Sequence, residues 1–238
     1  MKKIMIQEKL NELGVHLKDI RLGDFDQIGE YTAKKSRDPS SNLYKEVGCF
    51  FRPNYERGLL MYYLVRKKEI KSVLEIGFGR GYATFCMAKA MCDHGIDGTI
   101  TTVDPAFDKT FLEDLTKVFP RIWFEKIQFI QATSDEFFKE HTDEKYDFIY
   151  IDGDHRYEAV KNDWENSKDK YEKFLLFDDY LMSDKVETDI ECASVIDKIK
   201  DKSKELIVMD RRIFVDDRGY SDEEIRSGQV LLTRKKEG

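Results

Sequence analysis

Five side chains able to bind a metal ion or to move a proton follow two apolar segments: Asp152, Asp154, His155, Asp178 and Asp179. The first three close a predicted strand over 146–152, and the last two close another over 173–178. Because ligands bind at the carboxyl ends of strands in open α/β sheets, we expect these groups in one cleft. Several negative charges in a partly dry cleft are costly without a cation. The pattern therefore predicts a hard divalent cation with oxygen ligands, most simply Mg²⁺.

A glycine-rich turn follows another short apolar segment. Residues 73–82 read Val-Leu-Glu-Ile-Gly-Phe-Gly-Arg-Gly-Tyr, and the chemically informative positions are Glu75, Gly77, Gly79 and Gly81. Glycines permit a tight turn and let a ligand approach the backbone closely. A dinucleotide-binding turn would need its third glycine where Tyr82 stands. The spacing therefore disfavours NAD.

The next predicted strand, 99–104, also ends in an acid, Asp104. Asp104 stands 27 residues after Gly77 (104 − 77), which leaves room for one helix. Together with the Glu-x-Gly-x-Gly-x-Gly turn, this arrangement resembles the class I S-adenosylmethionine (SAM) methyltransferases. The resemblance implies that the glycine loop lies against the methionine part of SAM and that Asp104 accepts both ribose hydroxyls. A plain tight turn and a solvated acid are the structural alternative.

The turn Ala132–Asp135 lies where related enzymes contact the adenine ring. Ser134 is the hydroxyl that the resemblance assigns to this contact, and a helix N-cap is its structural alternative. The implied cofactor-binding set is Glu75, Gly77, Gly79, Gly81, Asp104 and Ser134.

The motifs Ile-Asp-Gly-Asp-His-Arg-Tyr over 151–157 and Phe-Asp-Asp-Tyr over 177–180 carry a narrower likeness. They resemble the metal-dependent sugar O-methyltransferases of the macrocin and aminocoumarin type, in the cephalosporin-hydroxylase-like group, and the resemblance covers roughly residues 55–235. It implies metal ligation by Asp152, Asp178 and Asp179. The metal would lower the pKa of an acceptor hydroxyl while a nearby base takes its proton.

The base is either Asp154 or His155, and the sequence does not choose between them. His155 is slightly preferred because the unperturbed pKa of histidine lies near neutrality. Structural alternatives are a hydrogen-bonded histidine at a helix N-terminus and an N-cap role for Asp154. The expected acceptor is a hydroxyl of a sugar or another small metabolite.

Elements that position these residues alternate along the chain. Strands are predicted at 72–76, 99–104, 126–131, 146–152, 173–178, 204–210 and 228–234, and helices at 80–93, 108–118, 134–140, 156–171 and 186–201. This alternation predicts an α/β fold with parallel βαβ units. The family resemblance implies a Rossmann-like, doubly wound, seven-stranded sheet whose last strand is antiparallel.

The first part of the chain differs from the rest. We expect residues 1–70 to form an N-terminal helical cap or lid, with helices at Ile4–Leu13 and Asn54–Lys67, and residues 71–238 to form the SAM-dependent methyltransferase domain. The stretch Tyr31–Ser41 either closes over a substrate or is a plain loop. Leu59–Leu64 is apolar enough to pack against the sheet or against a second copy, and a homodimer is expected.

Composition and charge indicate which partners and which cell compartment the sequence favours. A formal charge of −7, with 40 basic and 47 acidic residues, offers no general attraction for nucleic acid. Four cysteines without Cys-x-x-Cys spacing, and a start without signal-peptide features, favour the reducing cytoplasm. The absence of an apolar run of about 18 residues excludes a membrane span.

Other functions remain open at this point. The acids would be structural in a metal-independent methyltransferase, and the chain would be non-catalytic in a SAM-binding module that interacts with another protein. A hydroxylase using iron would want histidine ligands, and the chain has only four histidines. A nucleic-acid methyltransferase is disfavoured because the Asn/Asp-Pro-Pro-aromatic motif is absent. Acceptor selectivity is expected in residues 1–55 and Arg211–Arg226.

Overall fold

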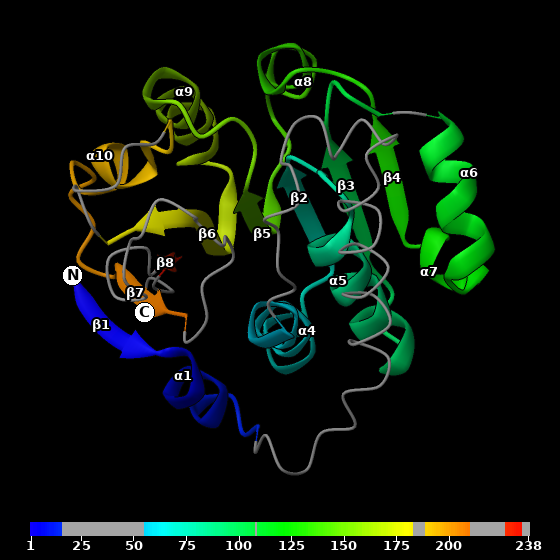
Figure 1. The fold of residues 1–238 in the computed structure, drawn as a ribbon, viewed down its shortest axis with the longest axis horizontal. Coiled ribbons are helices and arrows are strands. Elements are labelled where there is room, and N and C mark those ends of the chain that lie inside the picture. The colour runs from blue at the N-terminus through cyan, green and yellow to red at the C-terminus, as the bar shows by residue number, and fades with distance from the viewer. Residues whose placement is uncertain (16–54, 108, 183–188, 210–226, 235–238) are drawn as a thin grey trace, which may run out of the picture.

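An eight-stranded sheet organises the computed structural model, which describes residues 1–15, 55–107, 109–182, 189–209 and 227–234. The strands lie in the order β1-β7-β8-β6-β5-β2-β3-β4. They are β1 (Lys2–Met5), β2 (Ser72–Ile76), β3 (Thr99–Val103), β4 (Ile127–Ile130), β5 (Tyr146–Ile151), β6 (Tyr171–Leu181), β7 (Glu205–Val208) and β8 (Ser227–Thr233). All pairs are parallel except those that β8 makes with β6 and β7. The doubly wound α/β fold with an antiparallel last strand is confirmed (Figure 1).

The sheet has one strand more than the seven expected. Lys2–Met5, which was predicted partly as a helix, forms β1 and pairs in parallel with β7 at the edge of the sheet. Ile4 is buried, whereas both lysines before it are exposed. The helix α1 begins only at Ile6. The N-terminal segment therefore contributes to the central sheet as well as to a helix.

Helices cover both faces of the sheet, as Figure 1 shows: α8, α9 and α10 lie on one side, and α4 and α5 lie on the other. The helices are α1 (Ile6–Glu12), α4 (Tyr55–Lys68), α5 (Tyr82–Asp93), α6 (Lys109–Val118), α7 (Arg121–Phe124), α8 (Ser134–Glu140), α9 (Tyr157–Ser167) and α10 (Cys192–Ile196). The helix expected over 156–171 ends earlier, because β6 already begins at Tyr171. The helix expected over 186–201 is reduced to α10 within the described residues.

Two apolar clusters, one on each face, bury alternate residues of the same strands. In β5, Phe148 and Tyr150 belong to the cluster on the α4 and α5 side. Ile149 and Ile151 belong to the cluster beneath α9 and α10. This burial on both faces explains why the strands read as continuous apolar runs rather than alternating ones.

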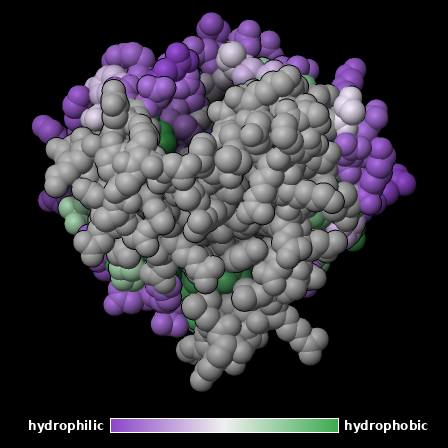
Figure 2. Space-filling model, in the orientation of Figure 1, coloured by the Kyte–Doolittle hydropathy of each residue, from purple (hydrophilic) through white to green (hydrophobic). Residues whose placement is uncertain are grey.

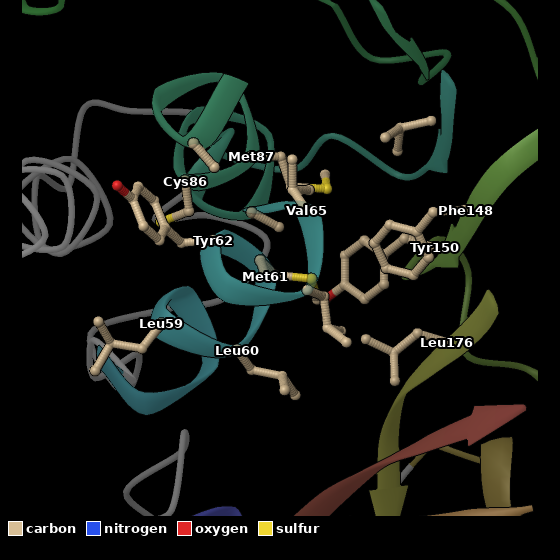
Figure 3. Close-up of a cluster of buried hydrophobic side chains, with 14 of the residues drawn as sticks. Leu59, Leu60, Met61, Tyr62, Val65, Cys86, Met87, Phe148, Tyr150 and Leu176 are labelled. Carbon is tan, nitrogen blue, oxygen red and sulfur yellow. The ribbon is translucent and has the colours of Figure 1, made fainter. Parts of the chain in front are cut away.

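The apolar run of α4 packs inside its own chain. Leu59, Leu60, Met61 and Leu64 are each at most 1% exposed. Figure 3 shows α4 between α5 and the strands that carry Phe148, Tyr150 and Leu176. This run therefore packs within the fold rather than against a second copy.

Cys86 of α5 is fully buried in the same cluster, and burial raises the pKa of its thiol above the usual range. Cys86 is therefore a packing residue. On the opposite face, Tyr157, Val160 and Trp164 of α9 pack into the second cluster.

The described surface visible in Figure 2 is mostly hydrophilic. Among the residues that the structure describes, the exposed large hydrophobic side chains are Met1 and Ile122. Within that same part of the chain, no helix combines the length and the apolar character needed to cross a membrane. The stretches Tyr31–Ser41 and Arg211–Arg226, to which closure and acceptor selectivity were assigned, lie outside the described residues.

Candidate active site

The glycine turn links β2 to α5 in a backbone conformation that side chains disfavour. Gly77, Gly79 and Gly81 have φ values of 90°, 52° and 79°. A Cβ atom at Gly77 would stand 2.2 Å from the carbonyl oxygen of Asp152, so only glycine lets the loops after β2 and β5 approach so closely. The turn therefore lies beside the acidic residues at the end of β5.

Asp104 lies against this turn from the neighbouring strand. Its Oδ2 accepts hydrogen bonds from the backbone N–H groups of Phe78 (3.0 Å) and Gly79 (3.1 Å). Its Oδ1 accepts one from the N–H group of Ala106 at 2.8 Å. The carboxylate therefore fixes the shape of the loop and stands at the mouth of the turn, where the sequence predicted a ribose contact.

Glu75 lies inside the protein rather than in the open turn. It is 1% exposed, and the Thr84 hydroxyl of α5 donates a hydrogen bond to its carboxylate. Burial raises the pKa of Glu75 to about 8. Its carboxyl group is therefore mostly protonated at neutral pH in the free protein.

Thr133, rather than Ser134, caps the helix α8. The Thr133 hydroxyl accepts a hydrogen bond from the N–H group of Glu136, whose carboxylate accepts one from the Thr133 N–H group in return. The N-cap alternative for Ser134 is therefore wrong. Close by in the fold, burial raises the pKa of Asp163 on α9 to about 6, and the Ser134 side chain opposes that rise.

The acidic residues converge because β5 and β6 are adjacent and parallel. Their pairing runs up to Ile151 opposite Phe177, so Asp152 and Asp178 follow at matching positions. The pairing of β6 with β8 shifts register just after Phe177, and Asp179 has a φ of 48°. A left-handed conformation in a residue other than glycine costs about 1–2 kcal/mol and often marks a functional site.

Arg57 of α4 enters this group and was missed by the sequence interpretation. Its guanidinium donates to the Tyr150 hydroxyl and to Asp152 Oδ2 at 2.5 Å, and it forms an ion pair with Asp178. Arg57, Tyr150 and Asp178 are all at most 8% exposed. The one detectable signal was a basic residue at the start of an otherwise apolar helix segment.

The Tyr150 hydroxyl completes this buried network. It lies 3.0 Å from Asp152 Oδ2 and within hydrogen-bond distance of Asp178 Oδ2. Burial raises the pKa of Tyr150 well above its usual value, so the hydroxyl keeps its proton and donates it. One guanidinium and one phenol therefore hold two of the acids expected to bind the metal.

A second group forms beside this network. Ligand atoms of Asp152, His155 and Asp179 lie within 4.8 Å of one another. His155 Nε2 is 3.5 Å from Asp179 Oδ2, and His155 Nδ1 is 3.9 Å from the Cys192 thiol. Two of the three expected metal-binding acids therefore meet around His155, whereas Asp178 faces Arg57 instead.

Asp154 is not part of this group. Its carboxylate accepts hydrogen bonds from the side chain and the N–H group of Arg156, which lower its pKa. Arg156 is the N-cap of α9, and the N–H group of Tyr157 donates to Glu191 instead of Asp154. The predicted N-cap role of Asp154 is therefore wrong.

Comparison with known proteins finds a likeness in the central part of the chain. Residues 74–180, less than half of the chain, match a family model described as a methyltransferase domain. This segment is similar to a methyltransferase domain. The matched stretch contains every site residue predicted from the sequence, whereas Arg57 precedes it.

The curated relative is distant. A protein of Mycobacterium sp. (strain JLS), named as an O-methyltransferase, is 29% identical over 97 residues, which are 41% of this chain and 43% of that protein. The match thus spans less than half the length of this curated relative.

Solved structures share the fold over nearly the whole chain. The O-methyltransferase TomG of Streptomyces achromogenes, involved in tomaymycin synthesis and solved with SAM, has a TM-score of 0.60 at 11% identity. The alignment covers 98% of this chain and 100% of TomG. A Bacillus cereus O-methyltransferase solved with S-adenosylhomocysteine has a TM-score of 0.58 at 12% identity, covering 96% of this chain and 97% of the other. The predicted resemblance to class I methyltransferases is confirmed, and the individual residue roles stay predictions.

Proposed function

We propose that this protein is a SAM-dependent O-methyltransferase that acts on a hydroxyl of a sugar or another small metabolite. The observation that carries the proposal is the contact between the glycine turn after β2 and the acid-bearing loop after β5, at Gly77 and Asp152. This contact sets a proposed cofactor loop directly beside groups suited to activating a hydroxyl. The solved O-methyltransferases that share the fold support the same chemistry.

In this proposal the cofactor lies along the carboxyl ends of β2, β3 and β4. The backbone of Gly77, Gly79 and Gly81 approaches the methionine part of SAM, and Asp104 accepts the ribose hydroxyls. Ser134, at the start of α8, contacts the adenine ring. Glu75 lies beneath the loop. Once its carboxyl group ionises, Glu75 binds the positively charged end of the methionine part.

The acid group fits a divalent cation. Three carboxylates and the Arg57 guanidinium carry a net charge of −2 when His155 is neutral. Asp179 is 5% exposed, and a buried carboxylate is costly without a cation nearby. We therefore retain Mg²⁺ as the proposed metal, with Asp152, Asp178 and Asp179 as the acids that the family resemblance assigns to it. A divalent cation bound there would lower the pKa of the acceptor hydroxyl.

A base near the metal group would remove the hydroxyl proton before the oxygen attacks the methyl group of SAM. His155 is one-third exposed beside Asp179, which orients its ring. Asp154 is more exposed and is held by Arg156. Both remain candidates for the base in the proposed reaction.

We also propose the domain organisation and the homodimer that the sequence predicted. Residues 1–70 are proposed to cap the site and to help select the acceptor, although 16–54 lie outside the described residues. The methyltransferase domain is proposed to span 71–238. A homodimer is also proposed, without a role for the buried run of α4.

Calorimetric titration tests the proposal. SAM would be titrated into wild type and into an Asp152→Ala/Asp179→Ala variant, followed by Mg²⁺ in saturating S-adenosylhomocysteine. Asp169→Ala, at an exposed acid after α9, is the matched control. SAM binding with Mg²⁺ uptake that only the double variant loses supports the proposal. SAM binding without Mg²⁺ uptake would favour the metal-independent alternative, in which Arg57 balances the acids, and no SAM binding would refute the function.

A further inference from the structure

The carboxylate of Asp178 is fully engaged by the protein itself. Its Oδ1 accepts the N–H group of Asp179 at 2.7 Å. Its Oδ2 meets the Tyr150 hydroxyl and the Arg57 guanidinium, and Asp178 is 2% exposed. A metal ion that used Asp178 would have to displace a buried guanidinium, leaving a charge without its partner. Such displacement is strongly unfavourable.

The carboxylate of Asp179, by contrast, accepts no hydrogen bond from the described residues. Asp179 is 5% exposed, and it has a left-handed backbone conformation within β6. Within the described part of the chain no hydrogen-bond donor reaches its carboxylate, and its ion-pair partner there is His155 Nε2 at 3.5 Å. A buried carboxylate that lacks a donor needs a cation.

Asp152 has one carboxylate oxygen held by the protein and one that accepts no hydrogen bond from the described residues. Its hydrogen bonds with Arg57 and Tyr150 both use Oδ2. Among the described residues, nothing hydrogen-bonds its Oδ1 side chain atom, which leaves that oxygen for a ligand. Asp152 therefore joins the guanidinium network to the group around His155.

We infer that the metal ion of the proposed methyltransferase is held by Asp152, His155 and Asp179, while Arg57 keeps Asp178 out of the ligand set. The inference rests on the proposed function and replaces one carboxylate ligand with an imidazole. Because His155 Nε2 then binds the metal, His155 is not free to act as the base in the proposed reaction. Arg57 is a positioning residue, because it acts through Asp178 and Asp152.

Electron paramagnetic resonance of bound Mn²⁺ tests this ligand set, since Mn²⁺ accepts the same oxygen-rich sites as Mg²⁺. In saturating S-adenosylhomocysteine, wild type is expected to show electron spin-echo modulation from one directly bound imidazole nitrogen. His155→Gln is expected to lose the modulation and to bind Mn²⁺ at least about tenfold more weakly. His141→Gln, at a partly exposed histidine after α8, is the matched control and should change neither.

The role of Asp178 needs a variant that keeps the charge balance. Arg57→Met/Asp178→Asn removes one positive and one negative charge together, so Mn²⁺ affinity should stay within about threefold of wild type and the nitrogen signal should remain. Loss of Mn²⁺ binding in this variant, with S-adenosylhomocysteine binding intact, would place Asp178 in the ligand set and overturn the inference. Should the double variant fail to fold, the His155→Gln spectrum still decides.

Failure of the inference and failure of the proposed function give different results. Mn²⁺ binding without nitrogen modulation, or no Mn²⁺ binding beside normal SAM binding, overturns the ligand set and leaves methyl transfer in place. Absence of SAM and S-adenosylhomocysteine binding in wild type removes the proposed function itself.

Discussion

Arg57 of α4 and Asp178 of β6 form an ion pair in the interior, where both side chains are at most 10% exposed. The pair joins a helix that precedes the matched methyltransferase segment to a strand near the end of that segment. It thereby ties the N-terminal part of the chain to the proposed site.

Arg57→Met should destabilise the protein by about 3–5 kcal/mol, because it leaves Asp178 as a buried charge without a partner. Arg57→Met/Asp178→Asn should recover much of that loss. Urea unfolding at pH 7 measures both. Arg66→Met, at an exposed position of the same helix, should stay within about 0.5 kcal/mol of wild type. Equal effects at Arg57 and Arg66 would show that the ion pair contributes little.

Glu75→Gln should stabilise the free protein at high pH while weakening cofactor binding. The pKa of Glu75, raised to about 8, lies above the ordinary carboxyl value, so ionisation opposes folding. Wild type should therefore lose stability as pH rises from about 4.5 to 8, and Glu75→Gln should lack that loss, worth about 3–5 kcal/mol at pH 9.

In the same variant, SAM affinity should fall about tenfold or more, the effect of losing one charged hydrogen bond. Chemical unfolding from pH 5 to pH 9 and calorimetry with SAM measure the two effects. Glu113→Gln, at an exposed glutamate of α6, is the control and should alter neither. A Glu75→Gln stability curve parallel to wild type across this range would contradict the expected buried ionisation.

Gly77→Ala should abolish SAM binding and lower stability by more than about 2 kcal/mol. The new methyl group would meet the Asp152 carbonyl oxygen at 2.2 Å, in addition to the strain of a φ of 90°. Gly95→Ala isolates the strain, because Gly95 has a φ of 60° and no neighbour within 4 Å of the added atom. It should cost only about 1–2 kcal/mol and keep SAM affinity. Thermal unfolding and calorimetry compare the two variants, and unchanged SAM affinity in Gly77→Ala would count against the proposed loop.

Glu205→Gln should loosen β1 in a pH-dependent way. Burial alone would raise the pKa of Glu205, but hydrogen bonds from Lys2 and Lys9 hold it below its usual value. The ionised form therefore stabilises the fold above the ordinary carboxyl pKa, and the contribution is lost as pH falls through the lowered value.

The thermal midpoint of Glu205→Gln should accordingly be about 2–4 °C lower than wild type at pH 7 and equal to it near pH 3. Differential scanning calorimetry at both values measures the difference. Glu12→Gln removes an exposed partner of the same two lysines and should have a smaller effect. An equal deficit at both pH values would argue for packing rather than charge as the cause.

Most of the central strands and the residues at their carboxyl ends could be predicted from the amino-acid sequence. Continuous apolar runs such as Leu175–Phe177 define strands buried on both faces, and the glycines at 77, 79 and 81 require a turn that only glycine adopts easily. Because these signals depend on neighbouring residues, the approximate strand positions and the expectation that the acids share one cleft followed from local pattern, whereas the direct pairing of β5 with β6 came from the structure.

The partners of the acids could not be predicted, because Asp178 pairs with Arg57 and Asp179 with His155 through long-range contacts. Arg57 reaches Asp178 across a long stretch of sequence, and no local periodicity reports which cation balances a buried carboxylate. The extra strand β1 likewise depends on a free edge at β7, since a four-residue segment has too little pattern to separate strand from helix. The positive φ of Asp179 follows from the register shift against β8, and it turns one acid towards His155 while the other stays with Arg57.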